Sequence, residues 1–199
     1  SSLDNLAAGE LDADSRRYAE RAADGGARLS SILNALSAAN HLEASISQAD
    51  KETFDLADLL QLLTQSYADA RPEHRFALQC PEGVQEYYGA PELLAQLLDK
   101  LVDNAVSFAP EGSEIALALE ANRQQYCLSV SNQGPPLPEG FGQKLFDSLV
   151  SVRDDGGKAG HLGLGLHIAR LIADFHQGSL EAANRGDGKG VTFTLRLPR

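Results

Sequence analysis

The chain contains little sulfur and has a deficit of positive charge. Its 199 residues include no methionine, no tryptophan and only two cysteines, and 17 Lys and Arg oppose 28 Asp and Glu, for a formal net charge of -11. This balance argues against a nucleic-acid-binding protein, because a basic face supplies most of the affinity for nucleic acid. Nucleotides stay possible, since they need only local positive charge and backbone donors.

Other absences narrow the class of protein further. Cys80 and Cys127 are distant in sequence and form no CxxC pair, which indicates two reduced thiols in a cytosolic protein. No apolar run approaches the roughly 18 residues of a membrane span, and no signal peptide is present. We therefore expect a cytoplasmic chain without membrane contact. The absence of Met and the abrupt start at Ser1 indicate a fragment or a processed product whose original start is missing.

The sequence changes character near residue 52. Before it, the pattern is helical, with one apolar face at spacings i, i+3, i+4 and i+7. That face comprises Leu29, Ile32, Leu33 and Leu36. Two arrangements would bury it: a helical hairpin packed on its own domain, or half of a dimeric four-helix bundle. We favour the bundle.

Residues 53–199 mix helices and strands. Helices are predicted at 56–68, 91–108 and 164–176, and strands at 54–56, 75–80, 84–88, 114–120, 126–130, 179–183 and 191–197. Pro91 suits a first helical position, and residues 147–162, rich in Asp and Gly, are predicted to be a mobile loop. This order predicts an α+β fold: an α/β sandwich whose mixed, mostly antiparallel sheet carries helices on one face.

The helix at 91–108 has two organised faces. Its buried stripe is Leu94, Leu97, Leu98, Leu101 and Ala105, and its polar stripe is Lys100, Asp103, Asn104 and Ser107. The polar stripe is either a solvated helix back or a site for metal and phosphate. In the second case the neutral side-chain oxygen of Asn104 suits Mg²⁺, which uses few protein ligands.

Two glycines stand directly before the last predicted helix. Gly163 and Gly165 would let the backbone come close to phosphates, and the following helix would direct free N–H groups at them. A glycine pair before a helix is also compatible with a plain turn. The phosphate interpretation gains weight from Asn104 upstream and from the Gly-Pro-Pro sequence at 134–136.

Five segments, in this order, resemble motifs of sensor histidine kinases and of the wider ATPase superfamily with the same nucleotide fold. They are Asp103–Ala105 (N box), Asn132–Pro138 (the Asp-x-Gly-Pro-Gly-Ile-Pro loop), Leu145–Leu149 (F box), Gly163–Leu166 (Gly-Leu-Gly-Leu) and Gly188–Phe193 (the final Gly-rich strand). Residues 1–52 resemble the later part of a dimerisation and histidine-phosphotransfer hairpin that lacks its phosphoacceptor box. The resemblance implies that residues 53–199 are an ATP-binding catalytic domain of the histidine kinase and Hsp90-like type.

The resemblance also implies ATP and Mg²⁺ as ligands. Asn132 would accept a hydrogen bond from the adenine amino group, Gly134 would lie close to the base, and Asn104 would hold Mg²⁺. Arg153 lies in the predicted loop and could neutralise the γ-phosphate. The implied ATP-binding residues are Lys100, Asp103, Asn104, Asn132, Gly134, Arg153, Gly163, Leu164 and Gly165.

Four positions depart from the family pattern. Lys100 replaces the first Asn of the N box, Asn132 replaces the adenine-binding Asp, Pro136 replaces the second Gly of its loop, and Ser107 replaces a common Lys. These changes fit either a re-tuned ATP site or a degenerate one. Lys100 also argues against the hydrolytic superfamily members, which place a water-activating Glu there, because a protonated Lys is no base.

No histidine of this chain stands in the phosphoacceptor context of the family. His41, His74, His161, His167 and His176 are followed by Leu, Arg, Leu, Ile and Gln. The resemblance therefore implies an ATP-dependent protein-histidine kinase whose acceptor lies outside this chain, so that the chain cannot label itself. Its implied partners are a response regulator receiver domain and a second copy of the chain, the homodimer being weakened by the truncated first helix. The full-length protein would be anchored in the inner membrane. The alternative is a degenerate module that binds a partner protein with little or no ATP turnover.

Overall fold

The computed structural model of the chain describes residues 17–19, 21–22, 25–26, 46, 49–138, 140–142, 144–146 and 164–199. Residues 17–19, 21–22, 25–26 and 46 are helical. The apolar face at Leu29–Leu36 and the whole of the loop predicted at 147–162 lie outside the described residues. None of the helices in the described residues is long and apolar enough to cross a membrane.

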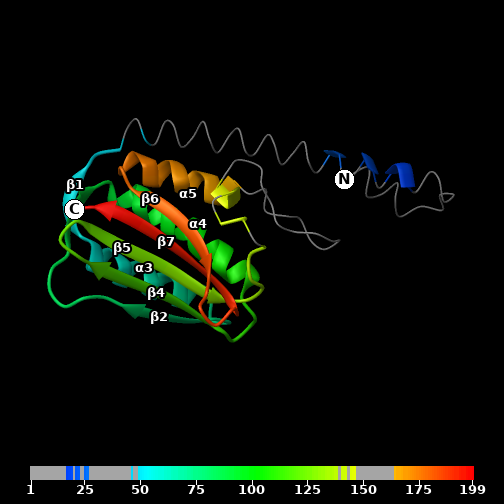
Figure 1. Cartoon of the computed structure of the whole chain (residues 1–199), viewed down its shortest axis with the longest axis horizontal. Coiled ribbons are helices and arrows are strands. Elements are labelled where there is room, and N and C mark those ends of the chain that lie inside the picture. Colours follow the sequence, from blue (N-terminus) through cyan, green and yellow to red (C-terminus); the bar gives the residue numbers. More distant parts are fainter. Residues whose placement is uncertain are drawn as a thin grey trace.

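A five-stranded sheet forms one layer of the domain (Figure 1). Its strands run in the order β2-β4-β5-β7-β6, with bounds Arg75–Gln79, Glu114–Ala121, Gln125–Gln133, Gly190–Pro198 and Ser179–Asn184. Only β2 and β4 pair in parallel, and the other three neighbouring pairs are antiparallel. The predicted mixed, mostly antiparallel sheet is therefore confirmed.

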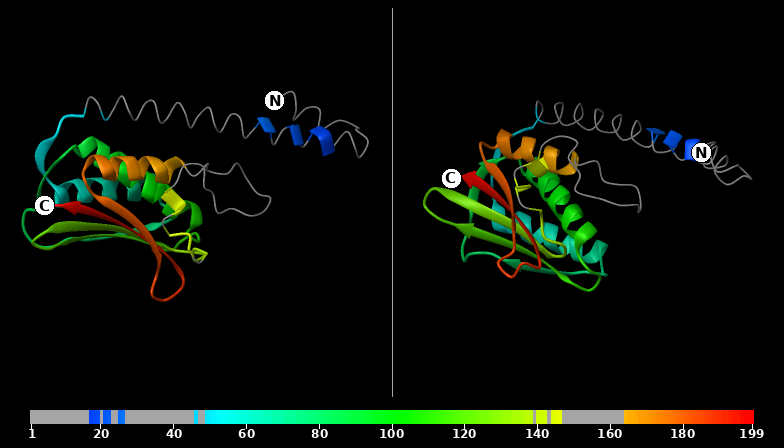
Figure 2. Two further views of the ribbon diagram at one scale, coloured as in Figure 1. Left: turned by 45° about the horizontal axis from the view of Figure 1, so that its top comes forward. Right: turned by 45° about the vertical axis from the view of Figure 1, so that its right-hand side comes forward.

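Three helices pack on one face of this sheet: α3 (Leu56–Ala70), α4 (Pro91–Phe108) and α5 (Leu164–Phe175) (Figure 2). A short 3₁₀ helix, η1 (Lys144–Phe146), precedes the last of them. A separate antiparallel pair, β1 (Glu52–Asp55) with β3 (Glu86–Gly89), closes one end of the domain. The prediction of helices on one sheet face is correct.

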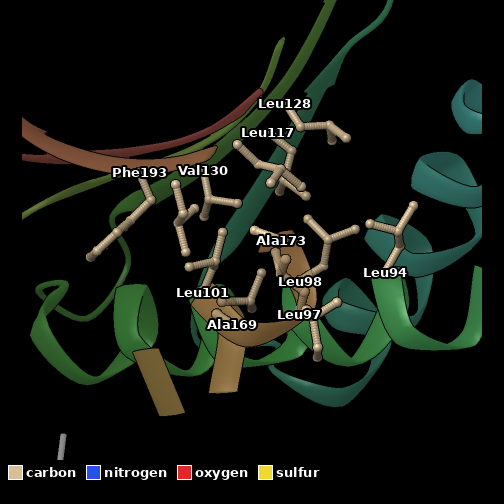
Figure 3. Packing of buried hydrophobic residues seen from close by; sticks show 14 of the residues in the cluster. Leu94, Leu97, Leu98, Leu101, Leu117, Leu128, Val130, Ala169, Ala173 and Phe193 are labelled. Atoms are coloured by element: carbon tan, nitrogen blue, oxygen red, sulfur yellow. The ribbon is translucent and has the colours of Figure 1, made fainter. Parts of the chain in front are cut away.

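The core lies between α4, α5 and the inner face of the sheet. Figure 3 shows Leu97, Leu98 and Leu101 of α4 directed toward side chains of the strands, with Ala169 and Ala173 of α5 beside them. Alternate strand residues, such as Leu117, Leu128 and Phe193, are at most 2% exposed. This alternation follows from the period-2 geometry of a strand with one covered face. The predicted stripe of α4 is also confirmed, because its residues are all buried.

Most predicted boundaries agree with the structure, and α4 coincides with its prediction at both ends. Two strand boundaries differ from their predictions. The strand predicted from Val84 begins at Glu86, because the Gln85 side chain donates hydrogen bonds to the carbonyls of Glu82 and Gly83 and holds a bend there. Strand β5 continues to Gln133, so Asn132 lies in the strand rather than in the loop that follows it.

Candidate functional site

The polar side of α4 divides into two faces. Asp99 and Asp103 face α3, whereas Lys100, one helical turn before Asn104, lies beside the start of α5. This follows from the 100° that separates successive residues on a helix. The sequence predicted one continuous stripe, and the structure replaces it with two faces that have different neighbours.

The acidic side chains on the face toward α3 are paired with other groups of the protein. The Tyr67 hydroxyl donates to Asp99 Oδ1 at 2.7 Å, and the Arg71 guanidinium forms an ion pair with the Asp103 carboxylate. Burial, followed by the hydrogen bond to Asp99, raises the pKa of Tyr67 far above its usual value. Asp103, predicted to contact ATP, thus joins α4 to the end of α3. Sequence reasoning missed Tyr67, Asp99 and Arg71, because nothing in the local pattern of α3 signals this pairing.

The polar side chains on the face toward α5 have no hydrogen-bond or ion-pair partner among the described residues. Lys100 and Asn104 are half-buried, and within the described residues neither side chain makes a hydrogen bond or an ion pair. The aliphatic part of Lys100 passes along Gly165: a Cβ built on Gly165 would lie 3.6 Å from Lys100 Cδ and 3.9 Å from its Cβ. One cationic group and one neutral amide are therefore held side by side and left unpaired.

Gly165 lies inside a helix in which the protein does not require a glycine. The 3.6 Å distance is ordinary van der Waals contact, and the backbone there does not adopt the left-handed region. Gly165 is the second residue of α5, and glycine costs a helix up to about 1 kcal/mol relative to alanine. A ligand approaching the helix start would explain the missing side chain, because only glycine lets another group come close to the backbone.

Asn132 and Gly134 lie where β5 ends beside the end of α4. Asn132 is 2% exposed, on the inner face of the sheet, where it pairs with Ile115 and Val191. Gly134 has φ 149°, and a Cβ on it would come within 2.5 Å of the Phe108 carbonyl oxygen. The close approach predicted for Gly134 exists, but in this structure its neighbour is the last residue of α4.

The Asn132 amide has a fixed orientation. Its nitrogen donates to the backbone carbonyl of Gln133 at 2.7 Å. Rotating the amide by 180° would place two oxygens against each other, so the hydrogen bond leaves the side-chain oxygen as the free acceptor. An acceptor in this position has the polarity that an amino group on a ligand requires, although it carries no charge.

Helix α5 is fixed to the protein at both ends, by different means. Near its start, His167 Nδ1 lies 3.1 Å from the carbonyl oxygen of Phe146 in η1. At its end, the buried ring of His176 accepts the Ala90 N–H on Nε2 at 3.0 Å, and Nδ1 donates to the Ile172 carbonyl at 2.8 Å. Burial lowers the pKa of His176, and the charge of Lys51 lowers it further.

Several predicted positions cannot be placed. Arg153 and Gly163 lie outside the described residues, and for Leu164 the structure describes only the backbone, at the first position of α5. Of the nine predicted ATP-binding residues, the structure brings Lys100 next to Gly165, and Asn104 follows Lys100 by one helical turn on α4. Gly134, two residues after Asn132, lies against Phe108 at the end of α4, one turn beyond Asn104.

The donor set fits a nucleotide with Mg²⁺. Asn104 provides a neutral oxygen of the kind that Mg²⁺ accepts, Lys100 provides positive charge, and Gly165 itself adds no side chain at the start of α5. This combination pairs poorly with an apolar ligand and well with phosphate oxygens. The fit rests on groups that the rest of the protein leaves unused.

Comparison with known proteins agrees with this fold. Residues 89–199 match the family described as histidine kinase-, DNA gyrase B-, and HSP90-like ATPase. The adaptive-response sensory kinase SasA of Crocosphaera subtropica is 31% identical over 170 residues, which cover 84% of this chain and 44% of that protein. The chain spans less than half the length of the first curated relatives that it matches.

Solved structures show the same architecture. A nucleotide-free form of the catalytic domain of histidine kinase ThkA aligns with a TM-score of 0.66 at 26% identity, covering 75% of this chain and 97% of that domain. ThkA in complex with the response regulator protein TrrA aligns with a TM-score of 0.68 at 22% identity, covering 99% of this chain and 55% of that one, a likeness of fold alone. The chain therefore belongs to the histidine kinase-, DNA gyrase B- and HSP90-like ATPase family, within which it corresponds to the catalytic region of a sensor histidine kinase.

Proposed function

We propose that residues 53–199 bind ATP with Mg²⁺ along the face that α4 shares with the start of α5. The observation that carries this proposal is a pair of polar side chains without a partner among the described residues: Lys100, which lies beside Gly165, and Asn104, one helical turn after it. Charged groups are seldom left half-buried and unpaired without a ligand to meet them. The family match supports the same assignment.

Each residue receives a role from its chemistry. The Asn104 side-chain oxygen would hold Mg²⁺, which when bound neutralises phosphate charge. Lys100 and the backbone of Gly163, Leu164 and Gly165 would contact the phosphates. Arg153 would meet the γ-phosphate.

The remaining residues serve the base and the position of α4. The side-chain oxygen of Asn132 would accept from the adenine amino group, with Gly134 beside the base. We give Asp103 a positioning role for α4 beside its predicted contact with ATP, and its ion pair with Arg71 supports that role.

In the full-length protein this domain would serve a histidine kinase. The bond between the γ-phosphorus and the bridging oxygen of ATP breaks, a phosphorus–nitrogen bond forms on an acceptor histidine outside this chain, and ADP leaves. The phosphoryl group then passes to an Asp of a response regulator. The relatives named as sensory kinases, and the solved ThkA complex with its response regulator, support this course. An inner-membrane anchor for the full-length protein is part of the same proposal.

The helical residues before β1 would form a homodimer with a second chain. The apolar face at Leu29, Ile32, Leu33 and Leu36 supports this, because it needs a partner to be buried. Sedimentation over a range of concentrations should show reversible self-association that Leu33→Glu abolishes. A strict monomer at high concentration would show instead that this face folds onto its own domain.

Calorimetric titration with ADP and ATP, each with and without Mg²⁺, tests the central proposal. We expect weak but saturable binding, because Asn132 offers a neutral acceptor where the family has a carboxylate. Absence of heat and of any thermal shift at millimolar nucleotide would favour the degenerate partner-binding module. Incubation with radiolabelled ATP should leave no acid-labile phosphate on this chain, and label on any of its five histidines would contradict the acceptor assignment.

A further inference from the structure

Lys100 occupies the position where the family pattern has an amide, and the structure shows what surrounds it. It lies one helical turn before Asn104 on α4, and its aliphatic part packs along Gly165 at the second residue of α5. Within the part of the chain that the structure describes, its ammonium group has no hydrogen-bond or ion-pair partner. Because the stem passes Gly165, the ammonium group can reach the space at the start of α5.

The acidic groups nearest to Lys100 in the helix do not neutralise it. Asp99 accepts the hydrogen bond of Tyr67, and Asp103 is paired with Arg71, both on the side toward α3. Asn104, the neighbour on the same face, is neutral. Within the described residues, the face beside Gly165 therefore carries one full positive charge that no acidic group compensates.

An ammonium group and an amide treat a metal ion in opposite ways. An amide oxygen can ligate Mg²⁺, whereas an ammonium group has no lone pair and repels the cation. The same ammonium group binds phosphate oxygens directly as a compact charge with three donors. Replacing an amide by Lys100 thus removes one candidate metal ligand and adds a permanent cation at the phosphates.

We propose that Lys100 takes over part of the charge neutralisation of Mg²⁺, so that this chain binds the phosphates of a nucleotide with only weak dependence on the metal. This inference rests on the proposed function, because it concerns the same nucleotide site. It adds that metal-free nucleotide is a ligand in its own right, held by Lys100, and that Asn104 supplies only a small additional gain through the metal.

The experiment is calorimetric titration of the folded chain with ADP, once in EDTA and once with excess Mg²⁺. For the unaltered chain we expect the two dissociation constants to agree within about threefold. Lys100→Asn should weaken binding of metal-free ADP by about tenfold, the worth of one charge-assisted hydrogen bond, and Mg²⁺ should then restore most of the loss. Chemical denaturation of the variant verifies that it is folded.

Arg123→Asn is the matched control, because it removes one positive charge from the exposed turn between β4 and β5, at the opposite end of β5 from Asn132. It should leave both dissociation constants unchanged, whereas a loss equal to that of Lys100→Asn would reduce the effect to net charge and overturn the inference. A tenfold or greater Mg²⁺ requirement in the unaltered chain would overturn it even if no Lys100 variant folds, and would leave the proposed function standing. Absence of binding under both conditions would overturn the proposed function itself.

Discussion

The two ends of α5 are both held by the protein, but they differ in the polar groups that lie beside them. At the end, the His176 ring is bonded on both nitrogens, the Lys51 ammonium lies 4.4 Å from the centre of the Phe175 ring, and the Gly178 N–H bonds back to the Ala173 carbonyl at 2.8 Å. At the start, Lys100 beside Gly165 and Asn104 one turn further along α4 have no partner among the described residues. A helix end closed by protein contacts serves stability, whereas groups held in place and left unpaired serve a ligand.

Two glycines, Gly165 at the start of α5 and Gly178 after its end, also differ in what surrounds them. A Cβ on Gly178 would overlap the Arg196 carbonyl oxygen and lie 3.1 Å from Leu197 Cδ2, so the fold itself excludes a side chain there. A Cβ on Gly165 meets only the flexible stem of Lys100 at ordinary distance. Alanine substitutions at the two positions should therefore separate stability from binding.

The largest effect is expected at Gly178, which follows the C-terminal end of α5. Gly178→Ala forces α5 away from β7 and should lower the free energy of unfolding by about 2 kcal/mol, because backbone atoms cannot yield as a side-chain tip can. Urea denaturation measures this loss. The nucleotide affinity of the fraction that stays folded should be unchanged, and a stability equal to that of the unaltered chain would contradict the close contact.

Gly165→Ala is the counterpart of this substitution at the start of α5. It should keep or raise the free energy of unfolding, by up to about 1 kcal/mol, because alanine favours the helix. Its affinity for ADP should nevertheless fall, since the methyl group occupies the approach to the helix start. A variant that gains stability and keeps full affinity would remove Gly165 from the site.

Substitution of Asn104 tests whether the site at the start of α5 holds a metal ion. Asn104→Ala should weaken the Mg²⁺-bound nucleotide more than the metal-free one, because only the former uses the amide oxygen as a ligand. The difference should be larger in a Lys100→Asn background, about tenfold, where the metal carries more of the charge neutralisation. Calorimetry with and without Mg²⁺ measures both, and equal losses would show that Asn104 is structural.

Asn132 tests the contact with the base. Its amide nitrogen bonds to the Gln133 carbonyl, whereas its amide oxygen can accept a hydrogen bond from a ligand. Asn132→Asp replaces the free oxygen with a charged acceptor and should tighten ADP by up to about tenfold. The gain is reduced because a carboxylate cannot donate to the Gln133 carbonyl and must turn away from it. Unchanged or weaker affinity would remove Asn132 from contact with the base.

The smallest effect concerns His176 and pH. Its pKa is lowered in the folded protein by burial and by the charge of Lys51, whereas the unfolded chain titrates near about 6.5. Both states are therefore neutral above that pH, and below it the unfolded state takes up the proton first, so the free energy of unfolding falls with falling pH.

Denaturation of the unaltered chain and of His176→Gln between pH 5 and 8, a range of about three units around the ordinary histidine pKa, measures this contribution. The variant should be less stable at neutral pH but lose less on acidification. Parallel curves for the two proteins would show that His176 does not carry the pH dependence.

How far the site could be predicted depended on the kind of information that each residue carries. The glycines and amides of the motifs are recognisable from type and spacing, so Asn104, Asn132 and Gly165 could be named in advance. The pairing of Arg71 with Asp103 could not, because these residues lie 32 positions apart and no local pattern connects them. Likewise nothing in the sequence indicated that His176 accepts the N–H of Ala90, the residue before α4, which lies 86 positions earlier.

The sequence by itself determined the local elements and the chemistry available to them. Pro91 and the spacing of the leucines define α4 from end to end, and alternation defines the strands, because period and propensity act over a few residues. Only the tertiary structure decided the order β2-β4-β5-β7-β6 and the division of α4 into a face paired with α3 and a face left open beside α5. The reason is physical: periodicity states which side of a helix avoids water, but which groups meet on its polar side depends on the neighbours that folding brings there.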